Sequence, residues 1–230
     1  MKSDFSIVLY DNARGKAYIQ HLCNNGLYPD EVLLMPNNWT LPSTLKLSNK
    51  IDFDITESVH ETIKKHNLKT IPLEEASINA QDTIDKIENS GSKYIIFGGK
   101  GGEILKPPVL NAGKPILHIH PGITPFFRGS TTVYYSNLVE GKAGCSAFFF
   151  NEKIDEGEII IQKEYEMIKN IDLDYLFDPE IRARTLVLAV KKLAEDFGTT
   201  PQPKDNSSFP YFIIHPLLKH LSILKNGGIN

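Results

Sequence analysis

The sequence of 230 residues contains only two cysteines and no long apolar run. Cys23 and Cys145 are too few for a disulfide framework, and both lie in largely apolar patterns that favour burial over a nucleophilic role. No apolar run reaches the length of a membrane span, and the amino terminus lacks the apolar core of a signal peptide. These absences predict a cytoplasmic protein with no membrane partner.

An excess of positive charge is also missing. The 25 Lys and Arg residues are outnumbered by 28 Asp and Glu residues, which gives a net charge of -3 and disfavours nucleic acid as a partner. With 41% hydrophobic residues, the chain can bury the full core of a soluble globular protein. The length predicts one domain over residues 1–198, with a carboxyl-terminal extension over residues 199–230 packed on it.

A complete phosphate-binding motif is absent as well. Residues 5–10 are typical of a buried first strand, and Arg14, Gly15 and Lys16 follow where a helix should begin. A strand–loop–helix of this kind can hold a phosphate, but the dinucleotide glycine fingerprint and the P-loop pattern are both missing. Arg14 and Lys16 are therefore candidates for binding a substrate phosphate, and solvated surface cations are the alternative.

The rest of the chain alternates short apolar runs with amphipathic segments. This pattern predicts an α/β fold with a Rossmann-like, mostly parallel sheet and flanking helices. The expected strands are residues 5–10, 31–35, 51–55, 71–73, 93–99, 115–119, 145–150 and 158–162. The expected helices begin after residue 16 and at residues 57, 79, 130, 180 and 215, with Ser130 capping the fourth and the fifth running to residue 197.

The most informative stretch is residues 116–160, which opens with the sequence LHIHPG at residues 117–122. His118 and His120 are two residues apart on a predicted strand, so both project from one face. Pro121 and Gly122 end the strand, which places both imidazoles at its carboxyl end, where ligands bind in open α/β sheets. An acidic turn that contains Asp155 follows the next predicted strand, residues 145–150, and joins it to residues 158–162. The set predicts a proton-handling site, with a metal site or two structural imidazoles as the alternatives left open by spacing alone.

Three ordered segments resemble the formyltransferase family that uses 10-formyltetrahydrofolate. HPGITPFFRG at residues 120–129 resembles the family's His-Pro segment and Arg-Gly loop, and DEGEII at residues 155–160 matches its Asp-x-Gly turn. Residues 95–105 fit the folate-binding loop more loosely. The resemblance implies the formyltransferase fold and an N-formyltransferase activity. One departure matters, because the family's asparagine falls on His118.

The resemblance also implies roles for the three polar residues of this stretch. His120 would be the general acid and base, since an imidazole can take a proton from an amine near pH 7. Asp155 would favour the imidazolium form, and His118 would donate a hydrogen bond to the developing oxyanion in place of the family amide. The cosubstrate would be 10-formyltetrahydrofolate, with no metal required. Its expected contacts are Gly102, Glu103, Ile104, Leu105, Asn151, Lys153 and Ile154, with ordinary core packing as the alternative for the three apolar side chains.

The acceptor that the resemblance favours is a nucleotide-linked amino sugar in surface-glycan biosynthesis. Arg128, Arg182 and Arg184 join Arg14 and Lys16 as candidates for holding its diphosphate, with plain surface or structural cations as the alternative. Family members of this kind imply a homodimer. The competing interpretations are a glycinamide ribonucleotide formyltransferase-like enzyme, a formyltetrahydrofolate hydrolase that passes the formyl group to water, and a folate- or nucleotide-binding module disabled by His118.

Overall fold

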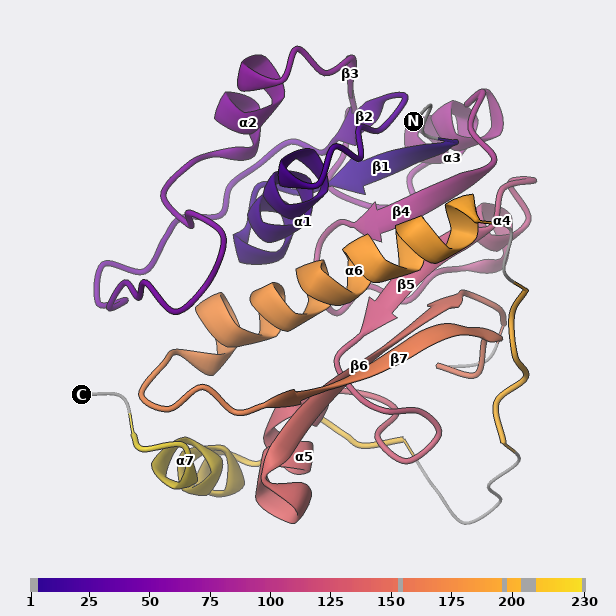
Figure 1. Cartoon of the computed structure of the whole chain (residues 1–230). Helices are drawn as coiled ribbons and strands as arrows, with labels where there is room; N and C mark the ends of the chain where they lie inside the picture. Colours follow the sequence, from indigo (N-terminus) through magenta and orange to yellow (C-terminus); the bar gives the residue numbers. More distant parts are fainter. Residues whose placement is uncertain (1–3, 153–154, 196–197, 204–209, 229–230) are drawn as a thin grey trace.

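The fold is built on one mixed sheet of seven strands in the order β3-β2-β1-β4-β5-β6-β7 (Figure 1). The computed structural model describes residues 4–152, 155–195, 198–203 and 210–228. The strands are β1 Phe5–Leu9, β2 Val32–Leu34, β3 Thr70–Pro72, β4 Tyr94–Gly98, β5 Ile116–His120, β6 Lys142–Phe149 and β7 Ile159–Glu166. The first five pair in parallel, while β6 and β7 are antiparallel. The expected Rossmann-like, mostly parallel sheet is therefore confirmed.

Helices cover both faces of this sheet. They are α1 Ala13–Asn24, α2 Val59–Lys65, α3 Gln81–Glu88, α4 Pro107–Leu110, α5 Thr132–Glu140, α6 Asp178–Ala194 and α7 Pro216–Lys225, with a π-helical turn η1 Leu173–Phe177 before α6. Helices α1 and α6 lie together on one face, and α3 and α4 contribute to the core of the other (Figure 1). Within the described part of the chain, none of the helices combines the length and the apolar character that a membrane span requires.

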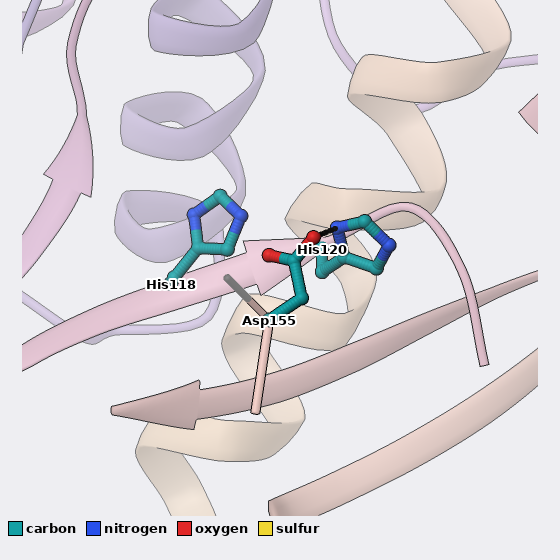
Figure 2. Close-up of side chains that lie close together, drawn as sticks. All are labelled: His118, His120 and Asp155. Carbon is teal, nitrogen blue, oxygen red and sulfur yellow. Dashed lines mark ion pairs between the residues drawn. The ribbon is translucent and has the colours of Figure 1, made fainter. Parts of the chain in front are cut away.

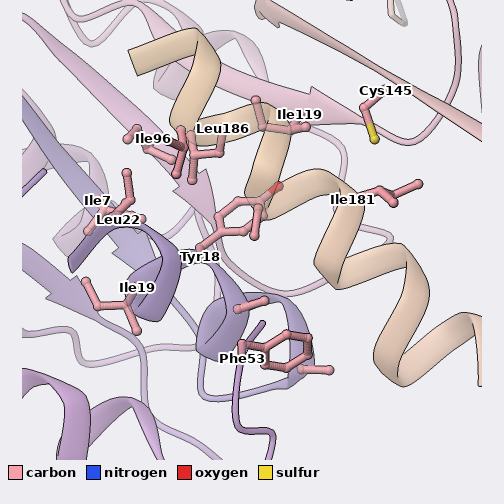
Figure 3. Close-up of a cluster of buried hydrophobic side chains, with 14 of the residues drawn as sticks. Ile7, Tyr18, Ile19, Leu22, Phe53, Ile96, Ile119, Cys145, Ile181 and Leu186 are labelled. Carbon is pink, nitrogen blue, oxygen red and sulfur yellow. The ribbon is translucent and has the colours of Figure 1, made fainter. Parts of the chain in front are cut away.

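The core beneath α1 and α6 fixes the direction of the two histidines of β5. Tyr18 of α1, Leu186 of α6 and Ile119 of β5 belong to one fully buried cluster (Figure 3). Successive strand residues point to opposite faces. His118 and His120 flank Ile119 and therefore leave the strand on the face opposite α1 and α6.

Two predictions from the sequence are wrong: the strand over residues 51–55 and the helix cap at Ser130. Residues 51–55 form no strand, although Phe53 and Ile55 are buried as an alternating pattern would suggest. Asp54 instead exchanges two hydrogen bonds of 2.8 Å with the side chain of Gln20, so α1 satisfies this backbone in place of a neighbouring strand. The alternating apolar residues of this segment are therefore buried against a helix and not within a sheet.

Ser130 does not cap α5. The N-cap residue is Thr131, which has a left-handed φ of 52° and makes no capping hydrogen bond with its side chain. The amide of Ser130 donates to the carbonyl of Tyr211 at 2.8 Å, so this residue is held by a distant part of the chain. The helix predicted over residues 180–197 is α6, and residues 196 and 197 lie outside the described residues.

Both cysteines are buried and unpaired, as the sequence predicts. Burial raises the pKa of the Cys23 thiol to about 12 and raises that of Cys145 as well, so both thiols are protonated and unreactive near neutral pH.

The segment after α6 returns to the sheet and forms what we call the carboxyl-terminal strap, residues 200–202 and 211–214. Thr200 exchanges two backbone hydrogen bonds of 2.8 Å with Ile159 at the start of β7. Tyr211 donates from its amide to the carbonyl of Arg128 at 2.7 Å, and the amide of Ile214 donates to the Thr131 hydroxyl at 2.9 Å. The strap therefore contacts both loops that border the end of β5.

Candidate active site

His118, His120 and Asp155 converge at the carboxyl end of β5 (Figure 2). The ring centroids of the two histidines are 6.1 Å apart. Asp155 reaches them from the turn between β6 and β7, and its Oδ2 lies 3.5 Å from Nδ1 of His120. The predicted meeting of two imidazoles and one carboxylate is therefore present in the structure.

The surroundings of His120 determine which ring nitrogen carries its proton. The side chain is buried, and its Nε2 lies 2.6 Å from the carbonyl oxygen of Phe127. A carbonyl only accepts, so Nε2 carries the hydrogen and the neutral ring presents an unprotonated Nδ1 to Asp155. Burial lowers the pKa of His120, and the opposing charge of Asp155 offsets only part of this effect. The ring is thus neutral near pH 7 and ready to accept a proton at Nδ1.

Two separate segments hold Asp155, one through its carboxylate and the other through its backbone carbonyl. The amide of Gly129 donates to Oδ2 at 2.8 Å, and the side chain of Gln202 in the strap donates to the Asp155 carbonyl at 2.9 Å. Asp155 has a left-handed φ of 54°. Two residues later the turn passes so close to β6 that a Cβ on Gly157 would lie 1.9 Å from the carbonyl oxygen of Phe149. The turn therefore requires glycine at this position.

His118 is half-buried among aromatic side chains. Its ring stacks on Phe150 with centroids 4.5 Å apart, and its buried Nδ1 has no hydrogen-bond partner among the described residues. Burial lowers the pKa of His118 well below its usual value, and electrostatic interaction with His120 and with the charged Arg182 and Arg14 lowers it further. A buried polar group without a partner costs about 1–3 kcal/mol, which binding of a ligand can recover.

Arg182, one of the cations that the sequence predicts to hold a diphosphate, also contacts the strand of the two histidines. It extends from α6, and its Nη1 donates to the carbonyl of Ile119, between the two histidines, at 2.9 Å. Its Nε pairs with Asp178 at 2.9 Å. Arg182 also lines a cavity of about 210 Å³ together with Arg14 and Trp39. No local spacing relates residue 182 to residue 119, so the sequence offered no signal for this contact.

Three more of the cations predicted to bind substrate have different surroundings. Arg14 lines the cavity, and its Nη2 donates to the carbonyl of Gly99. Lys16 is buried instead, where its Nζ donates to Ile55 O at 3.0 Å and lies 3.7 Å from an Asp11 oxygen. Arg128 is also buried and forms an ion pair with Glu156. Of the three, Arg14 is the one that lines this cavity.

The predicted cosubstrate contacts also divide into separate groups. Glu103 accepts hydrogen bonds from residues 77–79, so its carboxylate orders a loop beside α3. Leu105 is buried in the core, whereas Ile104 is 71% exposed and offers an apolar surface to a ligand. Gly102 has a left-handed φ of 78° and Asn151 is exposed. Lys153 and Ile154 lie outside the described residues.

The contact between Gly129 and the strap gives a prediction for stability. Gly129 has a φ of 93°, and a Cβ there would lie 2.3 Å from the Tyr211 carbonyl oxygen. Gly129→Ala should therefore cost at least about 1–3 kcal/mol from backbone strain alone and displace the strap. Thermal unfolding measures the loss. Gly91→Ala is the matched control, because a Cβ at Gly91 meets nothing within 4 Å and its φ is ordinary. Equal melting temperatures for the two variants would contradict the prediction.

Comparisons with known proteins agree with this arrangement. A protein-family model described as formyl transferase matches residues 15–181. The methionyl-tRNA formyltransferase of Lactiplantibacillus plantarum is 24% identical over 185 residues, which cover 74% of this chain but 58% of that protein. The chain therefore spans little more than half the length of that relative.

Solved structures share the fold at low sequence identity. The phosphoribosylglycinamide formyltransferase of Anaplasma phagocytophilum has a TM-score of 0.60 and 13% identity, covering 85% of this chain and 89% of its own. An N-formyltransferase of Helicobacter canadensis, solved with folinic acid and dTDP-3-aminofucose, has a TM-score of 0.59 and 15% identity, covering 90% of this chain and 70% of its own.

Proposed function

Because the chain belongs to the formyl transferase family, we propose that it transfers a formyl group from 10-formyltetrahydrofolate to an amine. The observation that carries this proposal is the pairing of His120 and Asp155. The Phe127 carbonyl fixes the tautomer of His120, and its unprotonated Nδ1 faces the carboxylate at 3.5 Å. A base of this kind is what an amine nucleophile needs, because the proton that the amine loses must be accepted near neutral pH.

The residues act in a definite order in this proposal. As the amine nitrogen bonds to the formyl carbon, His120 accepts the amine proton at Nδ1. The new Nδ1–H then points at Asp155, whose negative charge stabilises the imidazolium. His118 donates a hydrogen bond to the formyl oxygen as negative charge develops on it. The imidazolium returns its proton to the departing nitrogen, which restores the neutral ring.

The cosubstrate supplies the activated formyl group, and two features of this chain suit it. The first is the buried, unpartnered Nδ1 of His118, which is available to a polar group of a ligand. The second is Ile104, an exposed apolar side chain on the loop after β4, at the same sheet edge as the end of β5. Gly102, Glu103, Leu105 and Asn151 would hold the cosubstrate through backbone groups or by shaping this loop.

We further propose that the acceptor is a nucleotide-linked amino sugar. The support is the cavity of about 210 Å³, which is lined by Arg14, Arg182 and the partly buried Trp39. Guanidinium groups bind phosphate well, and an indole ring stacks on a sugar or a base. Both guanidinium charges reach the site, since they lower the pKa of His118. A phosphate held in this cavity would lie beside Arg182, whose Nη1 donates to the carbonyl of Ile119, the residue before His120.

A product assay tests both the formyl transfer and the identity of the acceptor. The full chain is incubated with 10-formyltetrahydrofolate and, separately, with nucleotide-linked amino sugars, glycinamide ribonucleotide or methionyl-tRNA, and products are identified by mass spectrometry. We expect one formyl group to be added to an amino sugar. Formylation of glycinamide ribonucleotide alone would overturn the acceptor. Formyl release without any amine would indicate a hydrolase, and folate binding without turnover would indicate a disabled module.

A further inference from the structure

The three site residues also have the composition of a metal-binding set. Among the described residues, His118, His120 and Asp155 are the one group of three or more His, Cys, Asp or Glu side chains whose ligand atoms all lie within 4.8 Å of one another. Two imidazoles and one carboxylate are ligands that zinc and other divalent transition metals bind readily. The proposed formyl transfer does not use this property.

Two of the ligand atoms already have the state and spacing that a metal requires. Nδ1 of His120 is unprotonated in the neutral ring, because the Phe127 carbonyl holds the hydrogen on Nε2. Oδ2 of Asp155 lies 3.5 Å away. Two ligands on a tetrahedral zinc ion are about 3.3 Å apart, given zinc–ligand bonds of about 2.0–2.1 Å. These two atoms therefore need almost no movement to share an ion.

The hydrogen bonds that orient His120 and Asp155 are typical of metal sites. A histidine that binds a metal usually donates its other ring N–H to a backbone carbonyl, and a metal-binding carboxylate is itself hydrogen-bonded. His120 donates to Phe127 O at 2.6 Å, and Asp155 accepts from the Gly129 amide at 2.8 Å. Both ligands are thus oriented before any ion binds.

His118 completes the set. One of its ring nitrogens lies within 4.8 Å of the ligand atoms of both His120 and Asp155. The family asparagine could not serve, because an amide nitrogen has no free lone pair and an amide oxygen is a weak ligand for zinc. The ring must move inward by up to about 1.5 Å to bring a spacing of 4.8 Å to that of two zinc ligands. His118 is also the position at which this chain departs from the asparagine of its family.

Positive charge nearby limits how tightly an ion can bind. The guanidinium groups of Arg14 and Arg182 act on His118 and oppose a second cation. Arg182 is paired with Asp178 at 2.9 Å, which balances its charge locally. The site is therefore suited to reversible binding rather than permanent retention.

We propose that His118, His120 and Asp155 together bind a divalent transition-metal ion, such as Zn²⁺, in competition with the acceptor amine. The ion would occupy Nδ1 of His120, the atom that must accept the amine proton. Metal binding would therefore inhibit the enzyme rather than assist it. The inhibition rests on the proposed function, whereas the binding itself does not.

Binding is tested directly on the full chain after removal of metal by a chelator. Co²⁺ is titrated at pH 7 while visible absorption of a low-coordinate nitrogen and oxygen site is followed, and Zn²⁺ is then added to displace it. We expect one ion per chain, and binding at least about tenfold weaker in His118→Asn and in Asp155→Asn. His60→Asn is the matched control, because His60 is an exposed histidine on α2.

The outcomes separate the two proposals. Equal affinity in the wild type and His118→Asn, or no saturable one-to-one binding in the wild type, would overturn the metal site. Circular dichroism of each variant confirms that it is folded before its affinity is compared. In the activity arm, Zn²⁺ should inhibit formyl transfer reversibly, and His118→Asn should need at least about tenfold more zinc. A chain that binds zinc through His118 but transfers no formyl group would refute the proposed function and leave the metal site standing.

Discussion

Replacing His120 with asparagine is expected to lower kcat for formyl transfer by about 10²–10⁴-fold, the range that a positioned general acid and base contributes. Asparagine has no group that can take a proton from an amine near pH 7. The wild-type ring is held for this task by the Phe127 carbonyl at 2.6 Å and by burial, which keeps it neutral. Steady-state kinetics with the amine acceptor measures the loss.

The same variant should still bind folate, because the predicted cosubstrate contacts lie on other loops. Calorimetric titration with a non-reactive folate analogue checks this point. His60→Asn makes the same substitution on the exposed surface of α2 and should keep the wild-type rate. A His120→Asn enzyme that turns over at a rate comparable to the wild type would remove His120 from the mechanism.

Replacing Asp155 with asparagine should lower kcat by about 10²-fold and also move the pH profile. The negative charge of Asp155 raises the pKa of His120 by stabilising the imidazolium, and burial lowers it. The variant loses the raising effect alone, so its pKa falls further below 6.5. Since the neutral ring is the active form, the acid limb of kcat/KM should move to lower pH.

The substitution is conservative in shape, which isolates the charge. An asparagine side-chain oxygen can still accept the hydrogen bond that Gly129 donates to Asp155 at 2.8 Å, so the turn should keep its conformation. Comparison of unfolding temperatures verifies this. A profile whose acid limb stays in place, with an unchanged rate, would show that the carboxylate and His120 are not coupled.

The sequence predicted the elements of this site that depend on local periodicity. The alternation of strand residues placed His118 and His120 on one face, and the parallel sheet brought their strand to a ligand-binding edge. Asp155 could be joined to them because its turn has a recognisable pattern. Residues 51–55 were misread because the burial of Phe53 and Ile55 against a helix imitates the alternation of a strand.

Contacts made through backbone atoms or distant helices could not be foreseen in the same way. The carbonyl of Phe127 and the amide of Gly129 fix the two proton-handling groups, and any residue type carries such atoms. Arg182 extends from α6 to the carbonyl of Ile119, and Gln202 extends from the strap after α6 to the carbonyl of Asp155. Such partners are set by tertiary packing, and no spacing in the sequence encodes them.

The carboxyl-terminal strap has a consequence for how the protein is made. A ribosome synthesises the catalytic histidines and the Asp155 turn well before Gln202 and Tyr211, which hold the backbones of both loops. A nascent chain that already contains every proton-handling residue still has an unsupported site. We therefore expect the proposed formyl-transfer activity to appear late in translation, when the strap has left the ribosome and can dock on the sheet.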